Sequence, residues 1–237
     1  MRPKQNTSPV REGAPVALDL VVERTGVLHF LGYPDRQSPP DRMEGLLDEA
    51  IRVARSLVYA RGVFVRIPAA RAADLDLEPV DATGLVLGMV TIGDAIETRV
   101  SELLRIGAAT RSLFLDAAGN AAVEEAANRL GEMITENGEA PAKSAARKSR
   151  SARHVSCRIS PGYGRWPVTA QRALFDVVPH RAIGVSLLPT MLMTPRKTIS
   201  FAMWLGAGAR RIAGLSGCTL CELERCRYRR ADERAGD

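Results

Sequence analysis

The chain has 237 residues, of which 46% are hydrophobic and 25% charged, as is ordinary for a soluble globular protein of one large domain or two small ones. Its 33 lysines and arginines exceed its 27 acids, but aromatic residues make up 5%, which disfavours a nucleic-acid partner that needs base stacking. The first residues lead into no apolar signal segment, and no apolar run is long enough to span a membrane. We therefore expect a cytoplasmic protein without membrane contact.

The N-terminal region predicts a tail, an extended arm and one amphipathic helix. Residues 1–14 are polar and without periodicity, which predicts disorder. Residues 18–22 predict a short strand or extended arm, and residues 27–33 form an apolar patch that ends in a glycine turn. Residues 38–41 predict the start of a helix with Ser38 as its cap, and apolar residues then recur at helical spacing. One face of this helix is expected to pack into a core.

Two strands and two helices are predicted next. Residues 62–67 and 84–92 carry β-branched and apolar side chains between glycines, which indicates strands. Residues 95–106 place their apolar side chains on one helical stripe. Residues 113–124 predict a helix rich in small residues that packs tightly against the sheet, with Asp116 near a turn.

A basic joint at residues 137–153 separates these elements from the C-terminal ones, and we expect it to be mobile or weakly helical. Pro167 suits the first turn of a helix that runs to about Val178. Residues 183–188 and 198–205 predict two strands. The second strand alternates with a period of two and has a largely apolar face.

The segment at residues 158–164, Arg-Ile-Ser-Pro-Gly-Tyr-Gly, gathers the groups that a small zwitterionic ligand needs. The fork of Arg158 can hold a carboxylate through two hydrogen bonds, and the ring of Tyr163 offers a π face to a cation. Pro161 and Gly162 predict a sharp turn that leaves backbone amides open. The alternative is a plain surface turn, which is the commoner role of a Pro-Gly pair.

Several segments follow one another in a particular order: Leu31-Gly32-Tyr33, Thr91-Ile92-Gly93, Leu115-Asp116 with Gly119 and Ala122-Val123-Glu124, residues 158–164, residues 183–187, and residues 193–200. In this order they resemble the cobalamin-dependent methionine synthase activation domain family, in its standalone form. The resemblance implies an α+β fold in which helices flank a twisted antiparallel β-sheet. It covers residues 15–237 as one unit, which contains the basic joint and a cysteine-rich tail at residues 214–237.

The resemblance implies a shallow site for S-adenosylmethionine, formed by Arg158, Ser160, Pro161, Gly162 and Tyr163. In the family the methyl group goes to the cobalt of a cobalamin on another domain or subunit, after one-electron reduction of inactive cob(II)alamin. Reduced cobalt is a strong nucleophile, so such a methyltransferase subunit mainly positions the donor, and we assign no catalytic side chain. The implied partners are a cobalamin-binding methionine synthase subunit or another corrinoid protein, and an electron donor such as a flavodoxin or a ferredoxin.

Two segments depart from the family pattern. Leu188-Pro189-Thr190 stands where the methionine synthase form has a threonine followed by an acid, so one polar contact to the ligand or cobalamin is missing. Ala202-Met203-Trp204 replaces a Trp-Tyr-type segment, which leaves Trp204 as the remaining aromatic candidate there.

The cysteines indicate a second site. Cys218, Cys221 and Cys226 have a C-x2-C-x4-C spacing that can bring three thiolates around one metal, and Cys157, next to Arg158, can complete a four-sulfur site. The site is expected to hold an iron–sulfur cluster or zinc, and incidental free thiols are the alternative. Disulfides are disfavoured in a cytoplasmic chain.

Two functions therefore stay open. One is an S-adenosylmethionine-binding reactivation subunit for a partner cobalamin-dependent methionine synthase, or for another corrinoid methyltransferase. The other is a metal-binding interaction or regulatory module that keeps the fold but does not donate a methyl group, as Pro189 and the basic joint suggest.

Overall fold

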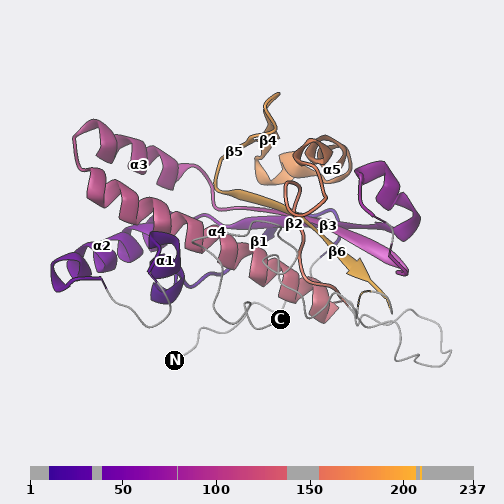
Figure 1. The fold of residues 1–237 in the computed structure, drawn as a ribbon, viewed down its shortest axis with the longest axis horizontal. Coiled ribbons are helices and arrows are strands. Elements are labelled where there is room, and N and C mark those ends of the chain that lie inside the picture. Colours follow the sequence, from indigo (N-terminus) through magenta and orange to yellow (C-terminus); the bar gives the residue numbers. More distant parts are fainter. Residues whose placement is uncertain (1–10, 34–38, 79, 138–154, 207–208, 210–237) are drawn as a thin grey trace.

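A four-stranded antiparallel sheet lies at the centre of the computed structural model, which describes residues 11–33, 39–78, 80–137, 155–206 and 209. Its strand order is β1-β2-β3-β6, with β1 at Val16–Ala17, β2 at Arg61–Pro68, β3 at Gly84–Thr91 and β6 at Thr198–Leu205. A separate antiparallel pair joins β4 (Ser186–Leu187) to β5 (Met193–Thr194). Helices cover both faces of the main sheet, so the fold is α+β with an antiparallel sheet and flanking helices, as the sequence predicted (Figure 1).

The central strand, β3, pairs along its whole length with both neighbours. Its register runs from Gly84 opposite Pro68 to Thr91 opposite Arg61 on one side, and from Leu205 to Thr198 on the other. Every β3 residue after Gly84 is buried. Strands that are covered on both faces carry near-continuous apolar sequence, which explains why this segment was the clearest strand prediction.

Helix α4 (Ala109–Asn137) lies along one face of the sheet (Figure 1). Three further α-helices pack against α4: α1 (Arg24–Leu31), α2 (Asp41–Leu57) and α3 (Ala95–Arg105). We call the apolar cluster between these helices and the sheet the α4-side core, and Phe64, Val90 and Phe201 are its sheet members. The many alanines of α4 allow close approach, since a Cβ built on Gly26 of α1 would lie 3.3 Å from that of Ala121.

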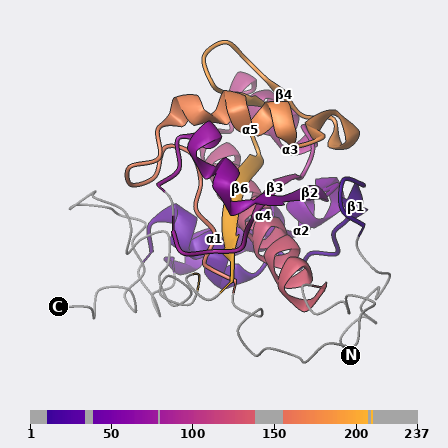
Figure 2. The ribbon, with the colours of Figure 1, turned by 90° about the vertical axis from the view of Figure 1, so that its right-hand side faces the viewer.

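The opposite face is covered by shorter elements: the 3₁₀ helices η1 (Ala69–Leu75), η3 (Val168–Ala170) and η4 (His180–Ile183), and helix α5 (Gln171–Val177). Figure 2 shows α5 on one side of the sheet and α1, α2 and α4 on the other. We call the second apolar cluster, which includes Leu87, Trp166 and Trp204, the α5-side core. Trp166 closes it by donating its ring N–H to the Leu75 carbonyl oxygen at 2.7 Å.

Three predicted elements differ from the structure. The apolar patch at residues 27–33 belongs to α1, which ends at Gly32 with a φ of 84°. A helix of about two turns is too short for its periodicity to stand out in sequence. The strand predicted at residues 183–188 is extended only at β4, because the chain completes η4 first. The helix predicted at residues 113–124 is the middle of the 29-residue α4, so Asp116 lies inside a helix and not near a turn.

The predicted strand or arm at residues 18–22 begins where β1 ends, with the Leu18 amide donating to the Ala60 carbonyl oxygen at 3.0 Å. The described end of the predicted tail, residues 11–14, is bonded to β2. Gly13 donates its amide to the Phe64 carbonyl oxygen at 2.8 Å, and Glu12 accepts the Arg66 amide. Residues 1–10, Ser38, the joint after residue 137 and the cysteine-rich tail lie outside the described residues. None of the described helices is both long and apolar enough to cross a membrane.

Candidate ligand site

Residues 155–160 run along the outer edge of β6 like a broken additional strand. Ile159 and Ala202 exchange two backbone hydrogen bonds, at 3.0 and 2.8 Å. Ser156 donates its amide to the Trp204 carbonyl oxygen and accepts the Trp204 amide with its hydroxyl oxygen. Successive side chains of an extended chain point to opposite faces of a sheet. Accordingly, Ile159 packs into the α5-side core, whereas Arg158 lies on the α4 side.

The guanidinium of Arg158 is held between β6 and α4. Its Cζ atom lies 5.6 Å from the centroid of the Phe201 ring, a cation–π distance. Its Nη2 atom donates to Glu124 Oε1 at 2.5 Å and to Asn128 Oδ1 at 2.7 Å, and the side chain is 18% exposed. Both hydrogen bonds leave from Nη2, the nitrogen that takes part in both two-pronged edges of a guanidinium. Nη1 and Nε point to different sides, so a ligand carboxylate could accept from Nη1 alone, and could form a two-pronged pair only by sharing or displacing a hydrogen bond of Nη2.

The Phe201 ring under Arg158 owes its position to a glycine on the next strand. Gly88 of β3 stands opposite Phe201 of β6. A Cβ atom built on Gly88 would lie 2.4 to 2.9 Å from three atoms of the Phe201 ring, closer than any side chain tolerates. The ring therefore fills the space above Gly88 and provides the surface on which the guanidinium rests.

Acids line α4 on both sides of the Arg158 contact. Asn128 hydrogen bonds to Glu125 as well as to Arg158. Burial raises the pKa of Glu125; the Asn128 hydrogen bond lowers it, and the nearby carboxylates of Glu132 and Glu23 raise it further. Arg158 thus provides positive charge next to a helix surface rich in carboxylates.

The turn after Arg158 has the predicted shape but not the predicted open amides. Gly162 has a φ of 92°, and its amide donates to the Trp166 carbonyl oxygen at 2.8 Å. The Tyr163 amide donates to the Ser160 carbonyl oxygen, and the Trp166 amide donates to that of Tyr163. These amides bond within the turn because it closes over the buried ring of Trp166. Pro161 is buried, whereas the Tyr163 side chain is 56% exposed and accessible to a ligand.

The metal ligands predicted from the cysteine spacing fall in two places. Cys157 is a free, partly buried thiol beside Arg158. Burial raises its pKa, and the charge of Arg158 lowers it. Cys218, Cys221 and Cys226 lie outside the described residues. Within the described part of the chain, no group of three or more His, Cys, Asp or Glu side chains is arranged to hold a metal ion. The four-sulfur site stays a prediction.

One polar cluster near this site was missed by the sequence. Lys197, whose side chain is 10% exposed, donates to Asp116 Oδ1 at 2.7 Å and to Asn120 Oδ1 at 2.6 Å. A Cβ atom on Gly119 would lie 3.2 Å from the Lys197 Cε atom, so the glycine leaves room for the lysine to cross α4. Asp116 and Asn120 are one helical turn apart, and this spacing is the feature of the sequence that could have indicated a shared polar partner. The cluster ties the start of β6 to α4.

The structure places the two departures from the family pattern, Trp204 and Pro189, in different surroundings. Trp204 is 2% exposed and belongs to the α5-side core, so it is not available as an aromatic contact to a ligand. Pro189 is exposed in the connection between β4 and β5.

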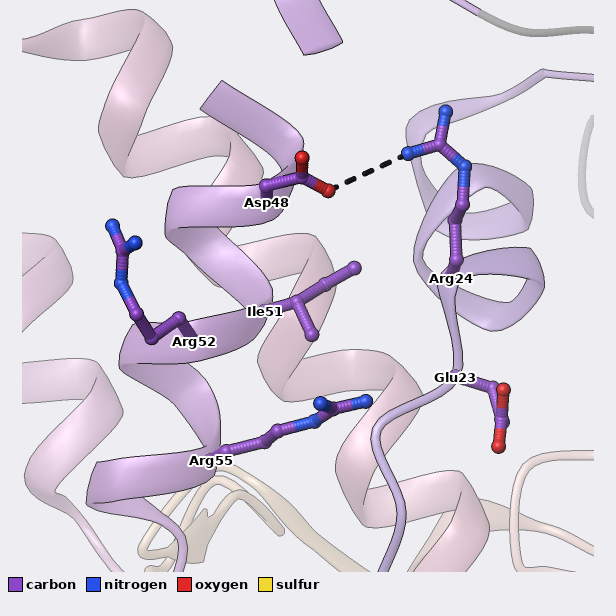
Figure 3. A pocket seen from close by; sticks show the side chains of 6 residues that line it. All are labelled: Glu23, Arg24, Asp48, Ile51, Arg52 and Arg55. Carbon is purple, nitrogen blue, oxygen red and sulfur yellow. Dashed lines mark ion pairs between the residues drawn. The ribbon is translucent and has the colours of Figure 1, made fainter. Parts of the chain in front are cut away.

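Two surface pockets lined by described residues do not include Arg158. One, of about 390 Å³, lies between α1 and α2 and is lined by Glu23, Arg24, Asp48, Ile51, Arg52 and Arg55 (Figure 3). Arg24 reaches Asp48 across it at 3.7 Å and binds both oxygens of Glu44, so its charges are largely satisfied. The other, of about 620 Å³, lies beside α3 and contains Glu97 and Arg196, which pair with each other.

Comparison with known proteins supports a relationship at the level of the fold. No protein-family model matches the chain, and no curated protein matches it. Among solved structures, it is similar to the crystal structure of the MetH reactivation domain bound to AdoHcy, with a TM-score of 0.53 and 14% sequence identity. The match covers 86% of this chain and 81% of that chain. The two proteins therefore share a fold over most of their length.

Proposed function

We propose that this protein binds S-adenosylmethionine beside Arg158 and acts as the reactivation subunit of a partner cobalamin-dependent methionine synthase. The observation that carries the proposal is the placement of Arg158. Its guanidinium is fixed on Phe201 by Glu124 and Asn128, directly before the Pro-Gly turn. This arrangement occurs in a fold that resembles a reactivation domain crystallised with AdoHcy.

The chemistry of the site suits the amino-acid end of this ligand. Nη1 of Arg158 would donate a charge-assisted hydrogen bond to the carboxylate, and a second bond would form where Nη2 shares a hydrogen with the ligand. Glu124 would then lie beside the ammonium or sulfonium group and oppose its positive charge. Because Glu124 already holds the guanidinium in place, little side-chain entropy remains to be lost on binding. The exposed Tyr163 ring would contact the adenosyl side.

The role of these residues is to hold the donor. S-adenosylmethionine would supply the methyl group and leave as S-adenosylhomocysteine, and a cobalamin on the partner protein, reduced by one electron from a flavodoxin- or ferredoxin-like donor, would accept it. Positioning a methyl donor against a strong nucleophile requires no general base. This requirement agrees with a site that offers one fixed cation, one acid and one exposed ring.

Isothermal titration calorimetry with S-adenosylmethionine tests the proposal. We expect saturable binding by the intact protein and a loss of about tenfold or more in affinity for Arg158→Ala, as for a lost charge-assisted pair. Arg165→Gln is the matched control, because Arg165 lies in the same turn but is exposed and pairs with Glu78. Undetectable binding by the folded, intact protein would contradict the proposal.

Methyl transfer is tested separately. We expect transfer of label from methyl-labelled S-adenosylmethionine to chemically reduced cobalamin to be faster with the protein than without it. The acceleration should be lost in Arg158→Ala. If the protein bound S-adenosylmethionine but did not accelerate methyl transfer, the result would favour a ligand-binding or regulatory module over a methyltransferase subunit.

A further inference from the structure

Arg61 lies on the face of the sheet opposite to Arg158. It is the first residue of β2, opposite Thr91 of β3. The next residue, Gly62, faces the helices, since a Cβ atom built on it would lie 3.0 Å from Leu130 of α4. Neighbouring positions on a strand alternate, so Arg61 projects toward the α5 side. It is therefore separate from the site proposed around Arg158.

Two groups lie close to the Arg61 guanidinium. Its Cζ atom lies 4.7 Å from the centroid of the Tyr59 ring, and Tyr59 is 65% exposed. A Cβ atom built on Gly184 would lie 3.4 and 3.5 Å from the two terminal nitrogens of Arg61. Gly184 is exposed and has a φ of 72°, so a side chain there would be strained and would also crowd the guanidinium.

Within the described part of the chain, this guanidinium has no carboxylate partner. Its Nε atom is buried without a hydrogen bond, alone in this respect among the buried side-chain nitrogens and oxygens described. Arg66, on the same strand, provides the contrast. It also lies over a ring, that of Phe64 at 5.1 Å, but it has the carboxylate of Glu12 at 3.7 Å.

We infer that Arg61 and Tyr59 form a binding site for an oxyanion, the carboxylate or phosphate group of a small ligand. An arginine fork stacked on an aromatic ring is preorganised for planar recognition of such groups. Tyr59 and the backbone at Gly184 lie against the fork, and the anion supplies a negative charge that the described residues do not provide there. Tyr59 also leaves one face of the site open to solvent.

A purely structural role accounts for this arrangement less well. A half-buried cation whose buried Nε–H group lacks a hydrogen bond costs free energy of folding, and the cation–π contact with the exposed Tyr59 offsets only part of that cost. Proteins retain such groups where binding requires them, and replacing them commonly leaves stability unchanged or raises it. We therefore expect Arg61→Gln to unfold thermally at the same temperature as the intact protein, or higher.

The test follows the Arg61 side chain by NMR of arginine Nε–H groups in the full chain, with Arg61→Lys identifying the resonance. Sodium phosphate and sodium acetate are titrated separately, with ionic strength held constant by sodium chloride. We expect a saturable shift of the Arg61 resonance, distinct from any response of Arg158, to which the proposed function also assigns a carboxylate. The anion that acts at the lower concentration, phosphate or acetate, identifies which chemical group the natural ligand carries.

Variants make the inference falsifiable. Tyr59→Leu should weaken anion binding by about two- to fivefold, through loss of the stacked ring. Arg66→Gln is the matched control. The anion concentration that half-saturates the Arg61 shift should stay within about twofold of that in the intact protein, because Arg66 is not expected to contact the anion. Shifts that are linear and equal for all arginines, or no shift of Arg61, would overturn the inference. So would a lowered unfolding temperature of Arg61→Gln without anion binding, since this is the behaviour of a structural residue.

Discussion

Arg158 and Glu124 join the edge of the sheet to the long helix α4 through an ion pair of 2.5 Å between residues 34 positions apart. The pair fixes the guanidinium over Phe201 and, among the described residues, leaves Nη1 without a side-chain hydrogen bond. A carboxylate ligand that accepts from Nη1 would bind without displacing Glu124. The acid would then act with the arginine on a zwitterion and would not compete with it.

Glu124→Gln tests this relationship. The amide oxygen can still accept from Arg158, but the negative charge is lost, so we expect S-adenosylmethionine affinity to fall several-fold and stability to fall by about 1 kcal/mol. Calorimetry and chemical denaturation measure the two effects. Glu132→Gln, an exposed acid on the same helix, is the control. Tighter ligand binding by Glu124→Gln would show that Glu124 competes with the ligand carboxylate.

Gly88→Ala should be strongly destabilising. The added methyl group would lie 2.4 Å from the Phe201 ring in a fully buried strand, and overpacking of this kind costs about 1–3 kcal/mol or more. We expect Gly45→Ala, on the exposed side of α2 with nothing within 4 Å, to stabilise by about 0.5–1 kcal/mol. Thermal and denaturant unfolding compare the two. Equal stability of the two variants would mean that Phe201 does not rest against Gly88.

Glu125→Gln should change how stability depends on pH. Burial raises the pKa of Glu125, so the folded protein holds this proton more tightly than the unfolded chain. Stability is then lost as pH rises from the ordinary carboxyl value of about 4.3 through the raised value. The variant should therefore exceed the intact protein in stability at pH 7 and equal it below about pH 4. Chemical denaturation between about pH 4 and pH 7 measures the difference in stability between Glu125→Gln and the intact protein, and Glu136→Gln, at an exposed acid, is the control. A stability gain of Glu125→Gln that does not change with pH would show that the raised pKa of Glu125 is not its cause.

The predicted four-sulfur site calls for metal analysis. We expect anaerobically purified protein to contain an iron–sulfur cluster, with visible absorption, or one bound zinc, and Cys218→Ser to remove it. Cys157→Ser distinguishes a site that includes the ligand loop from one confined to the tail. A metal-free protein with four titratable thiols would contradict both alternatives.

Much of the fold followed from local pattern. Strand β3 and helices α2 and α3 were predicted within a few residues, because burial on both faces or on one stripe leaves a clear period in the sequence. The short helix α1 was not predicted, because it spans only about two turns. The full length of α4 was not predicted either, because its sequence alternates small residues with acids. Family resemblance, carried by motifs in order, predicted the sheet architecture.

The sequence by itself determined where the chain would be helical or extended, that Pro161 and Gly162 would form a turn, and that Arg158 would stand before it. Only the tertiary structure decided what these residues meet. It paired Arg158 with Glu124 and Asn128, bonded the turn amides to carbonyl oxygens of the same turn, and left Arg61 on Tyr59 without an acid among the described residues. The physical reason is that periodicity and turn propensity act over a few neighbouring residues. A charge's partner, by contrast, depends on which strand edge and which helix face the whole fold brings together.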